Sequence, residues 1–462
     1  ILGVLAFWLF AQTTLNINVD MAKDLGMDAS MMNIAVSITA LFSGIFIVVF
    51  GGLADKVGRV KIIRIGFYFS IIGSLLVGLT PVGNAAEAVL TGRIFQGLSA
   101  AAIMPASLAL VKAYWEGKER QRAISLWSMG SWGGSGFAAL FGGLMVSVGW
   151  RWIFFGAAAV SVIGLILIKG TPESKAIGKE HKKTDHAGII TFMLAMIALQ
   201  ILMTSGAHLG FTSIVLIAAT LLFSILFYYI EKGKNDAFID FKLFKNMIFT
   251  GATISNFLLN GTAGILIVSL ILLQVGGNLS AQEAGMLTLG YAIAIVLFIR
   301  MGEKMLQRFG ARKPMIWGSL IVGVSIILLM FTNVMTDTYK ILAIIAYTLF
   351  GVGLAFYATP STDAALSNLP EDQAGAGSGI YKMASSLGAA FGVAVSAGIF
   401  AAFNAGDNIQ WLEGVLTFVG RQDNVVVREA ATIGLGVNLM MIVMAILIIL
   451  ITIPKSAGKT ND

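Results

Sequence analysis

Cysteine is absent from this 462-residue sequence, and histidine and charged residues are scarce. Without cysteine the chain forms neither disulfides nor thiolate metal sites. Its three histidines, His181, His186 and His208, are too scattered for a convincing metal cluster. Charged residues make up only 12% of the chain, against roughly 25% in soluble domains, whereas apolar residues make up 57%. We therefore expect no metal or cofactor, and a chain that lies mostly in lipid.

Long apolar runs fill most of the sequence, and most of them reach the ~20 residues that a helix needs to cross about 30 Å of hydrocarbon. Fourteen runs can be placed, near residues 1–19, 30–53, 62–80, 86–112, 123–148, 152–169, 187–206, 210–230, 247–274, 281–301, 313–332, 340–366, 377–403 and 431–453. The first run begins without methionine, so we expect a short segment before it, and no cleavable signal peptide can be read. We predict an all-α membrane protein with fourteen transmembrane helices.

The basic residues predict the orientation of these helices. With the N-terminus in the cytoplasm, 25 of the 31 lysines and arginines fall in inner loops and the C-terminal tail, five fall in outer segments, and Arg93 lies within a span. This asymmetry follows the positive-inside rule, so both termini are expected in the cytoplasm. The net charge of +7 then faces anionic lipid, and no nucleic-acid partner is expected.

One short loop separates the runs at 30–53 and 62–80. It reads Gly-Gly-Leu-Ala-Asp-Lys-Val-Gly-Arg-Val at residues 51–60. Gly51 and Gly58 allow tight backbone approach or a positive φ where the chain reverses. The loop is therefore expected to be a tightly packed turn at one membrane face.

The charged residues of this loop carry the first resemblance. Asp55 ends its span and can cap a helix or pair across the loop, while Lys56 and Arg59 are expected among lipid phosphates. The string resembles G-x-L-A-D-[RK]-x-G-R-[RK], the loop between spans 2 and 3 of the major facilitator superfamily. By that resemblance we expect the Asp55 loop to be a structural device of the cytoplasmic gate and not a substrate contact.

Three further motifs resemble that family, the first its general pattern and the other two its fourteen-span drug:proton antiporter branch. They are R-x-x-Q-G-x-x-A-A at residues 93–101, W-R-W-I-F at 150–154 and P-x-x-x-A-G-x-x-S-G at 370–379. The sequence departs from the branch in span 5, where Ala138-Ala139 replaces a Gly-Pro pair, and in span 1, where Ala11 replaces a mid-span Asp.

An internal repeat predicts how the spans are grouped. Residues 308–312 echo the Lys-x-Gly-Arg of the first loop eight spans later, with Gln307 where Asp55 stands. Repeats around a midplane site are usual in secondary transporters. We predict six-helix halves from spans 1–6 and 9–14 around an inserted two-helix hairpin, spans 7–8, with chain divisions at 1–170, 171–246 and 247–462. Residues 404–430 form an outer loop, whose Val-rich runs favour a small β-hairpin.

The resemblance implies a secondary active transporter of the bacterial cytoplasmic membrane, not an enzyme. It implies export of amphiphilic or cationic drugs, such as fluoroquinolones and dyes, in exchange for protons by alternating access, with the proton gradient as energy source. A monomer in the lipid bilayer is expected. One alternative is an uptake symporter for a small metabolite, and a remote one is a membrane-embedded enzyme, for which the sequence shows no catalytic constellation.

Aromatic side chains on spans expected to line a cavity favour a drug pump over a metabolite symporter, whose site should present paired polar groups. The cavity candidates are Asn16, Gln96, Trp127, Trp132, Asn256, Tyr291, Phe356 and Tyr357. We expect apolar drugs to bind against these aromatic faces.

Proton coupling needs a titratable group that is exposed alternately to the two sides. With Ala11 in span 1, the carboxylates on the outer half are Asp20 and Glu87. We predict that Asp20 faces Arg93, an intramembrane cation that is costly unless it is partnered. The alternative is that Asp20 is a solvated loop residue and that Arg93 snorkels to headgroups.

Asp363 is the next candidate carboxylate, about one turn from the inner end of span 12. It lies at a depth similar to that of Lys382, which replaces a polar Asn of the branch in span 13. We expect an Asp363–Lys382 ion pair, either structural or broken during the transport cycle.

Overall fold

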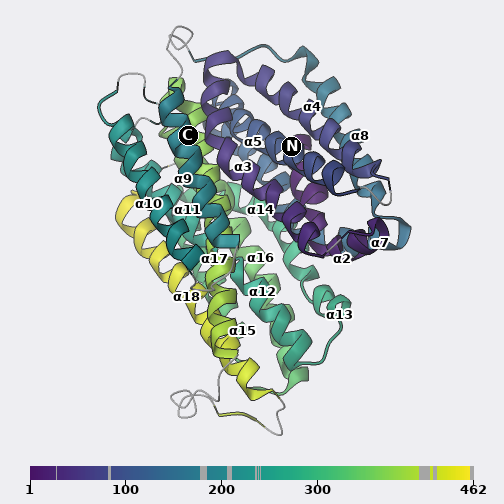
Figure 1. Cartoon of the computed structure of the whole chain (residues 1–462). Helices are drawn as coiled ribbons and strands as arrows, with labels where there is room; N and C mark the ends of the chain where they lie inside the picture. Colours follow the sequence, from purple (N-terminus) through teal and green to yellow (C-terminus); the bar gives the residue numbers. More distant parts are fainter. Residues whose placement is uncertain are drawn as a thin grey trace. The chain divides into compact units, whose positions relative to one another are not determined.

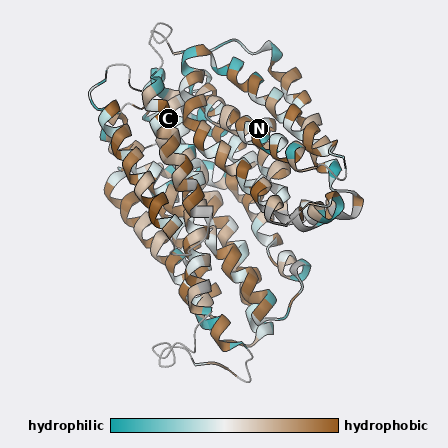
Figure 2. Ribbon diagram, viewed as in Figure 1, coloured by the Kyte–Doolittle hydropathy of each residue, from teal (hydrophilic) through white to brown (hydrophobic). Residues whose placement is uncertain are grey.

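Helix accounts for all the secondary structure of the residues that the computed structural model describes, which are 1–27, 29–81, 85–176, 185–204, 211–234, 237, 239, 241–404, 417–419 and 424–457 (Figure 1). Within these residues eleven helices are long and apolar enough to cross a membrane. Figure 2 shows that hydrophobic residues predominate along them. In hydrocarbon a helix satisfies every backbone hydrogen bond within its own segment, so apolar runs of this length fold as helices.

The chain forms two compact units. Unit 1 comprises Ile1–Thr250 and Asp363–Met383, and unit 2 comprises Gly251–Thr362 and Ala384–Asp462. The short segment Asp363–Met383 therefore packs with the N-terminal part of the chain, although the residues on either side of it belong to unit 2.

Unit 1 begins with helices that are short or interrupted and continues with long ones. Its elements are α1 (Leu2–Leu5), a π-helical turn (Ala6–Phe10), a 3₁₀ turn (Ala11–Thr13), α2 (Thr14–Leu25), α3 (Ala29–Val57), α4 (Arg59–Gly78), α5 (Ala85–Tyr114), α6 (Gly117–Ser128), a second π-helical turn (Met129–Gly133), α7 (Gly134–Val148), α8 (Arg151–Leu167), α9 (His186–Thr204) and α10 (Phe211–Glu231), with 3₁₀ turns at Ile168–Gly170 and Phe241–Lys245.

In unit 1, α3 and α4 both pack along α5, and α4 also packs along α8. Gly73 and Gly92 make the α4–α5 approach possible, because a Cβ on either one would lie 2.6–2.7 Å from the carbonyl oxygen of the other. Small residues at such a crossing let two backbones approach closely in a membrane. The helices α9 and α10 pack against each other, and α9 also contacts α3.

The first apolar run is longer and less regular than predicted. A π-helical turn and a 3₁₀ turn interrupt it, and α2 then continues to Leu25, so the run does not end near residue 19. Asp20 is consequently a helical residue, and the expectation of a loop beginning there is wrong. Gly26 ends α2 with a φ of 64°, a conformation that glycine adopts at little cost.

Unit 2 contains the second set of long helices. Its elements are most of α11 (Met247–Gly261), α12 (Gly264–Ile271), a π-helical turn (Leu272–Gly276), α13 (Ala281–Met286), α14 (Leu289–Phe309), α15 (Arg312–Met330), α18 (Val425–Thr452), and the larger parts of α16 (Thr336–Ser367) and α17 (Ala374–Asn404). Gly318 and Gly353 bring α15 and α16 together as Gly73 and Gly92 do in unit 1.

The predicted outer β-hairpin is corrected where the structure describes it. Val425–Val427, expected as its second arm, form the first turn of α18, and Thr417–Val419 are not a strand. The β propensity of three valines is weak beside the apolar helix that follows them. Residues 405–416 and 420–423 lie outside the described residues. Arg428, in the same turn, donates to the carbonyl oxygens of Thr332 and Val334 at 2.8 and 3.2 Å.

Candidate functional site

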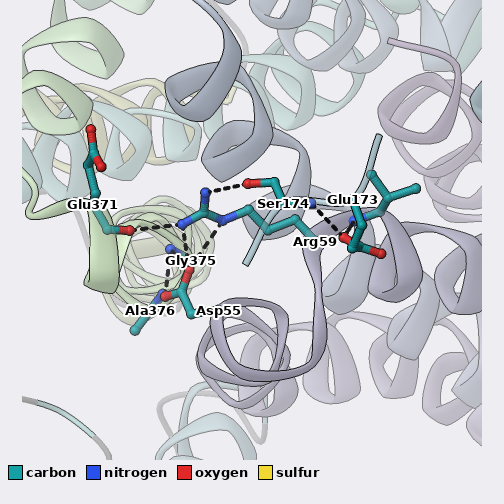
Figure 3. Close-up of polar contacts among 8 residues, drawn as sticks. Asp55, Arg59, Glu173, Ser174, Glu371, Gly375 and Ala376 are labelled. Carbon is teal, nitrogen blue, oxygen red and sulfur yellow. Dashed lines mark hydrogen bonds and ion pairs between the residues drawn. The ribbon is translucent and has the colours of Figure 1, made fainter. Parts of the chain in front are cut away.

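Asp55 lies in the last turn of α3 and binds the start of α17 (Figure 3). Its carboxylate accepts hydrogen bonds from the backbone N–H groups of Gly375, at 2.9 Å, and Ala376, at 3.0 Å. The first N–H groups of a helix have no partner within it, and the helix dipole favours a negative charge there. Asp55 therefore caps a helix that follows it by more than three hundred residues, as its predicted capping role allows.

Arg59 holds the same carboxylate from the other side. It donates from Nη2 and Nε to the Asp55 Oδ1 at 3.0 and 3.3 Å, and from Nη2 to the carbonyl oxygen of Glu371 at 2.9 Å. Both charged side chains are buried, Arg59 at 4% exposure and Asp55 at 0%. The expectation that Arg59 lies among lipid phosphates is wrong, because the charge of Asp55 draws it into the protein. Lys56 is half-buried.

Two glycines allow α3 and α17 to approach this closely. A Cβ on Gly51 would overlap the carbonyl oxygen of Gly375, and a Cβ on Gly375 would overlap the carbonyl oxygen of Gly51. One turn further, Gly379 faces the backbone of Ile47. The Gly-x-x-x-Gly spacing of α17 thus presents a flat surface to α3.

The segment 171–176 packs against the junction between α3 and α4. Glu173 accepts hydrogen bonds from the first backbone N–H groups of α4, those of Val60 and Lys61, at 2.9 and 3.0 Å. Ser174 accepts from the Arg59 Nη1 at 2.9 Å. Glycine is required at position 58 for two reasons. Its φ of 130° is one that other residues rarely adopt, and a Cβ there would lie 2.6 Å from the carboxyl carbon of Glu173.

A second ion pair, with a buried carboxylate and a half-buried arginine, joins α6 to the end of α16. The Nε of Arg120 lies 3.1 Å from the Oδ1 of Asp363, and Gln121 donates to the Oδ2 at 3.2 Å. Nearby, Lys112 donates to the carbonyl oxygen of Leu366 at 2.7 Å. The structure differs from the predicted Asp363–Lys382 pair, because the carboxylate of Asp363 is bound by Arg120 and Gln121 of α6.

Lys382 instead lies over an aromatic ring. Its Nζ is 4.9 Å from the ring centroid of Trp127, one of the predicted cavity residues. Trp127 donates from Nε1 to the hydroxyl of Ser107 at 2.9 Å, and both Lys382 and Trp127 are buried. Trp132, another cavity candidate, is half-buried in the π-helical turn that follows α6.

Arg93 is fully buried and does not reach the headgroups, so the snorkelling alternative is excluded. It donates to the carbonyl oxygens of Ala11 and Ala35 at 2.7 and 3.0 Å, and to the side-chain oxygen of Gln96 at 2.8 Å. The irregular turns of the first run leave the Ala11 carbonyl available. Gln96, predicted to face a cavity, also donates to Ser74 and thereby orients Arg93.

The predicted Asp20–Arg93 pair does not form. The side chain of Asp20 is exposed on α2, whereas the contacts of Arg93 are carbonyl oxygens and Gln96. Glu87 is also exposed, in the first turn of α5, where a carboxylate favours the helix N-terminus. The side chain of Asn16 lies outside the described residues.

The remaining cavity candidates lie in unit 2 and are buried. Asn256 donates to Ser385 at 2.6 Å. The Tyr357 hydroxyl lies 2.7 Å from the Ser255 hydroxyl. Tyr291 packs on Phe350, and Phe356 on Phe298.

Sequence reasoning missed Arg120, Gln121, Glu173 and Ser174. Arg120 was counted only among the basic residues of an inner loop, and Glu173 and Ser174 lie in a loop without a motif. The nearest signal was the A-G of residues 374–375, whose glycine marks the helix start that Asp55 caps. Among the described residues no cluster of histidine and carboxylate side chains could hold a metal ion.

A family model described as the Major Facilitator Superfamily matches residues 1–242 and 249–461. The chain belongs to the major facilitator superfamily. The resemblance drawn from residues 51–60 is thereby confirmed, and membership of this transporter family indicates a transporter rather than an enzyme.

Two curated relatives extend over nearly the whole chain. The quinolone resistance protein NorB of Staphylococcus aureus strain MRSA252 is 46% identical over 433 residues, which are 91% of this chain and 93% of that protein. NorB of the bovine strain RF122 / ET3-1 is 46% identical over 459 residues, 98% of this chain and 95% of that protein. These relatives and the eleven apolar helices indicate a multi-pass protein of the bacterial cytoplasmic membrane.

Solved structures of other members support the fold. The proton:xylose symporter XylE, bound to 6-bromo-6-deoxy-D-glucose, matches 99% of this chain and 95% of its own with a TM-score of 0.65 at 16% identity. The human organic anion transporter MFSD10 matches 96% and 97% with a TM-score of 0.66 at 13% identity. At these identities the match shows the major facilitator fold alone.

Proposed function

We propose that this protein exports amphiphilic drugs, quinolones among them, from the bacterial cell in exchange for protons. The observation that carries the proposal is the 46% identity to NorB, a quinolone resistance protein, over 98% of the chain. The buried contacts of Asp55 support the proposal. They hold the start of α17 against the end of α3 through a charged carboxylate, and we call this contact a fastening.

We further propose fourteen transmembrane helices with both termini in the cytoplasm. Six-helix groups at residues 1–170 and 247–462 would flank a hairpin at 171–246. The positions of the apolar runs, the packing of α9 against α10 and the distribution of lysine and arginine support this arrangement.

The gate in this proposal is the segment 363–383, which packs in unit 1. Asp55 fastens the start of α17, and Arg120 fastens the end of α16 through Asp363. Access from the cytoplasm would open when both fastenings are released. Each depends on a buried carboxylate charge, so protonation of either one would weaken it.

For proton coupling we propose Asp363 as the carrier. It is buried within a membrane helix, and its charge is balanced by Arg120 and a hydrogen bond from Gln121. Protonation would remove the negative charge and leave Arg120 without its partner, which favours separation of α16 from α6. Arg93 would then serve to tie α5 to α3 and to the first run through carbonyl oxygens.

For the substrate we propose a site lined by the aromatic candidates of unit 1, with the protein acting as a monomer. Burial of apolar surface stabilises a bound drug by about 25 cal/mol per Å². Trp127 and Trp132 supply such surface on α6 and on the turn after it.

Everted membrane vesicles test the proposed function. An imposed gradient, acidic inside, should drive quinolone into the vesicles and dissipate as drug enters. An uptake symporter would instead carry its substrate in the same direction as the proton. Drug movement that ignores the gradient, or no movement at all, would contradict drug:proton exchange.

A further inference from the structure

The junction between α14 and α15 repeats the motif of the Asp55 loop but lacks its acid. In the first copy Asp55 binds Arg59 at 3.0 Å. In the second copy Gln307 stands in place of Asp55, and its side chain donates to the carboxylate of Glu303 at 3.3 Å. Three cations follow, and within the described residues none of them forms an ion pair: Arg308, Arg312 and Lys313. The charge that the lost acid would balance is therefore open to a partner outside the chain.

Two of these cations lie over one aromatic ring. The Cζ of Arg308 is 5.2 Å from the ring centroid of Phe309, and the Nζ of Lys313 is 5.4 Å from it. Both cations are exposed, so the ring attracts each of them only weakly, whereas their like charges repel. The third cation, Arg312, is engaged elsewhere, since it donates to the carbonyl oxygen of Leu450 at 2.9 Å. An anion that contacts Arg308 and Lys313 together removes the repulsion between them.

One face of α15 continues from these cations into exposed apolar residues. In order along the helix, it consists of Lys313, Trp317, Leu320, Val324 and Ile327. Their spacing of four, three, four and three residues places them on one side of a helix. A cation, then a tryptophan, then aliphatic residues is the order that suits the headgroups, the interface and the hydrocarbon of a bilayer. The stretch from Trp317 to Ile327 rises about 15 Å at 1.5 Å per residue, which is the depth of one leaflet of a hydrocarbon core about 30 Å thick.

Trp317 joins the cationic and the apolar parts of this surface. Its ring packs edge-on against that of Phe309, with the centroids 5.4 Å apart and the planes at 73°. The ring that carries the two cations is thus continuous with the apolar face of α15. A ligand that fits the whole surface needs an anionic head and an apolar tail about 15 Å long, which a phospholipid has and a free phosphate lacks.

We propose that Arg308, Phe309 and Lys313, together with the exposed face of α15, form a binding site for one anionic phospholipid. The phosphate lies between the two cations, the glycerol part lies against Phe309 and Trp317, and an acyl chain lies along α15. A zwitterionic lipid carries its own cation beside the phosphate, so it gains less from the pair. The proposal concerns the lipid partner of unit 2 and does not depend on the transported substrate.

Native mass spectrometry of the purified protein measures the affinity for the first bound lipid. The probes are dioleoylphosphatidylglycerol, which is anionic, and dioleoylphosphatidylcholine, which has the same chains and no net charge. The wild-type protein should bind the anionic lipid about 25-fold more tightly, because each of two basic residues contributes about fivefold. The double variant Arg308→Gln/Lys313→Gln should bind the two lipids alike, with its affinity for phosphatidylcholine unchanged.

The matched control is the double variant Lys61→Gln/Lys169→Gln. It removes the same charge from two exposed lysines of unit 1, and within the described residues neither of these lies over an aromatic ring. The preference for the anionic lipid should stay within about twofold of the wild-type value. An equal loss in this control would mean that net charge alone attracts the lipid, and it would overturn the site.

A second measurement places the lipid beside Trp317 and leaves both cations intact. Dibrominated phosphatidylglycerol in phosphatidylcholine vesicles should quench the tryptophan fluorescence more than dibrominated phosphatidylcholine at the same mole fraction. The excess should disappear in Trp317→Phe, so this result decides the proposal where the charge variant does not fold. Equal quenching by the two lipids would overturn the site. Displacement of the lipid by inorganic phosphate, or by a second copy of the chain, would overturn it in favour of a phosphate site or a dimer interface.

Discussion

Replacing Asp55 by asparagine should release the start of α17 without changing the size of the side chain. Asparagine keeps one oxygen for the N–H groups of Gly375 and Ala376 but loses the charge that neutralises Arg59. Removing one partner of a buried ion pair costs about 3–5 kcal/mol. If most of that cost falls on the fastened state, the fastened population decreases by at least about a hundredfold, since 1.4 kcal/mol is a factor of ten.

The lack of cysteine makes this shift directly measurable. Ser378 is buried on α17, about one turn beyond Gly375, whose N–H binds Asp55. Ser378→Cys therefore provides a single thiol that is protected while Asp55 holds the start of α17. In the Asp55→Asn background its alkylation rate should rise about a hundredfold, and transport turnover should fall while the Kd for drug stays nearly constant. Lys61→Gln, which changes an exposed cation on α4, is the matched control. An unchanged alkylation rate, or a large loss of drug affinity at normal protein levels, would refute the reasoning.

Three further predictions follow from single contacts. Asp363→Asn and Arg120→Gln should each lower the free energy of unfolding by about 3 kcal/mol or more. The double variant should lose less than the sum of the two single losses, and additive losses in thermal unfolding would mean that the pair does not act as a unit. Gly375→Ala should lower the free energy of unfolding by about 1–3 kcal/mol through overpacking, although alanine favours helix, and a rise in Tm would contradict the close approach of α3 and α17. The hydrogen bond from Arg151 lowers the pKa of Asp24. The ionised Asp24 therefore contributes its full stabilisation above pH ~4, the usual pKa of aspartate, and this stabilisation is lost as the pH falls through the lowered pKa. Asp24→Asn should remove that part of the acid sensitivity of Tm, and an unchanged dependence of Tm on pH would contradict the assignment.

The sequence was sufficient for the all-helical architecture and for the family motif that carries Asp55, because both depend on local patterns. Apolar length predicts a membrane helix, and Gly58 marks the chain reversal with its positive φ. Gly51 lies within α3, so the turn predicted over residues 51–60 is shorter than expected. The partner of Asp55 was not visible, since Gly375 lies 320 residues away and no periodicity links the two.

Ion pairs were the weakest predictions for the same reason. Asp363 was paired with Lys382 from their similar depth, but depth does not say which helix faces which, and α6 supplies Arg120 instead. Arg93 was expected to need a carboxylate, yet it donates to the carbonyl oxygen of Ala11, in the irregular first run, and to that of Ala35, in α3. The β-hairpin predicted within residues 404–430 is wrong at its second arm, because Val425–Val427 belong to the long apolar helix that continues beyond them.

Coupled flux in proteoliposomes tests the central claim most directly. The purified protein is reconstituted with a pH-sensitive dye in the lumen, and norfloxacin is added outside with no imposed gradient. Drug:proton exchange predicts that drug entry makes the lumen more alkaline in wild-type protein, and that Asp363→Asn separates the two fluxes. Drug entry with no change in luminal pH, or entry that acidifies the lumen, would contradict the account.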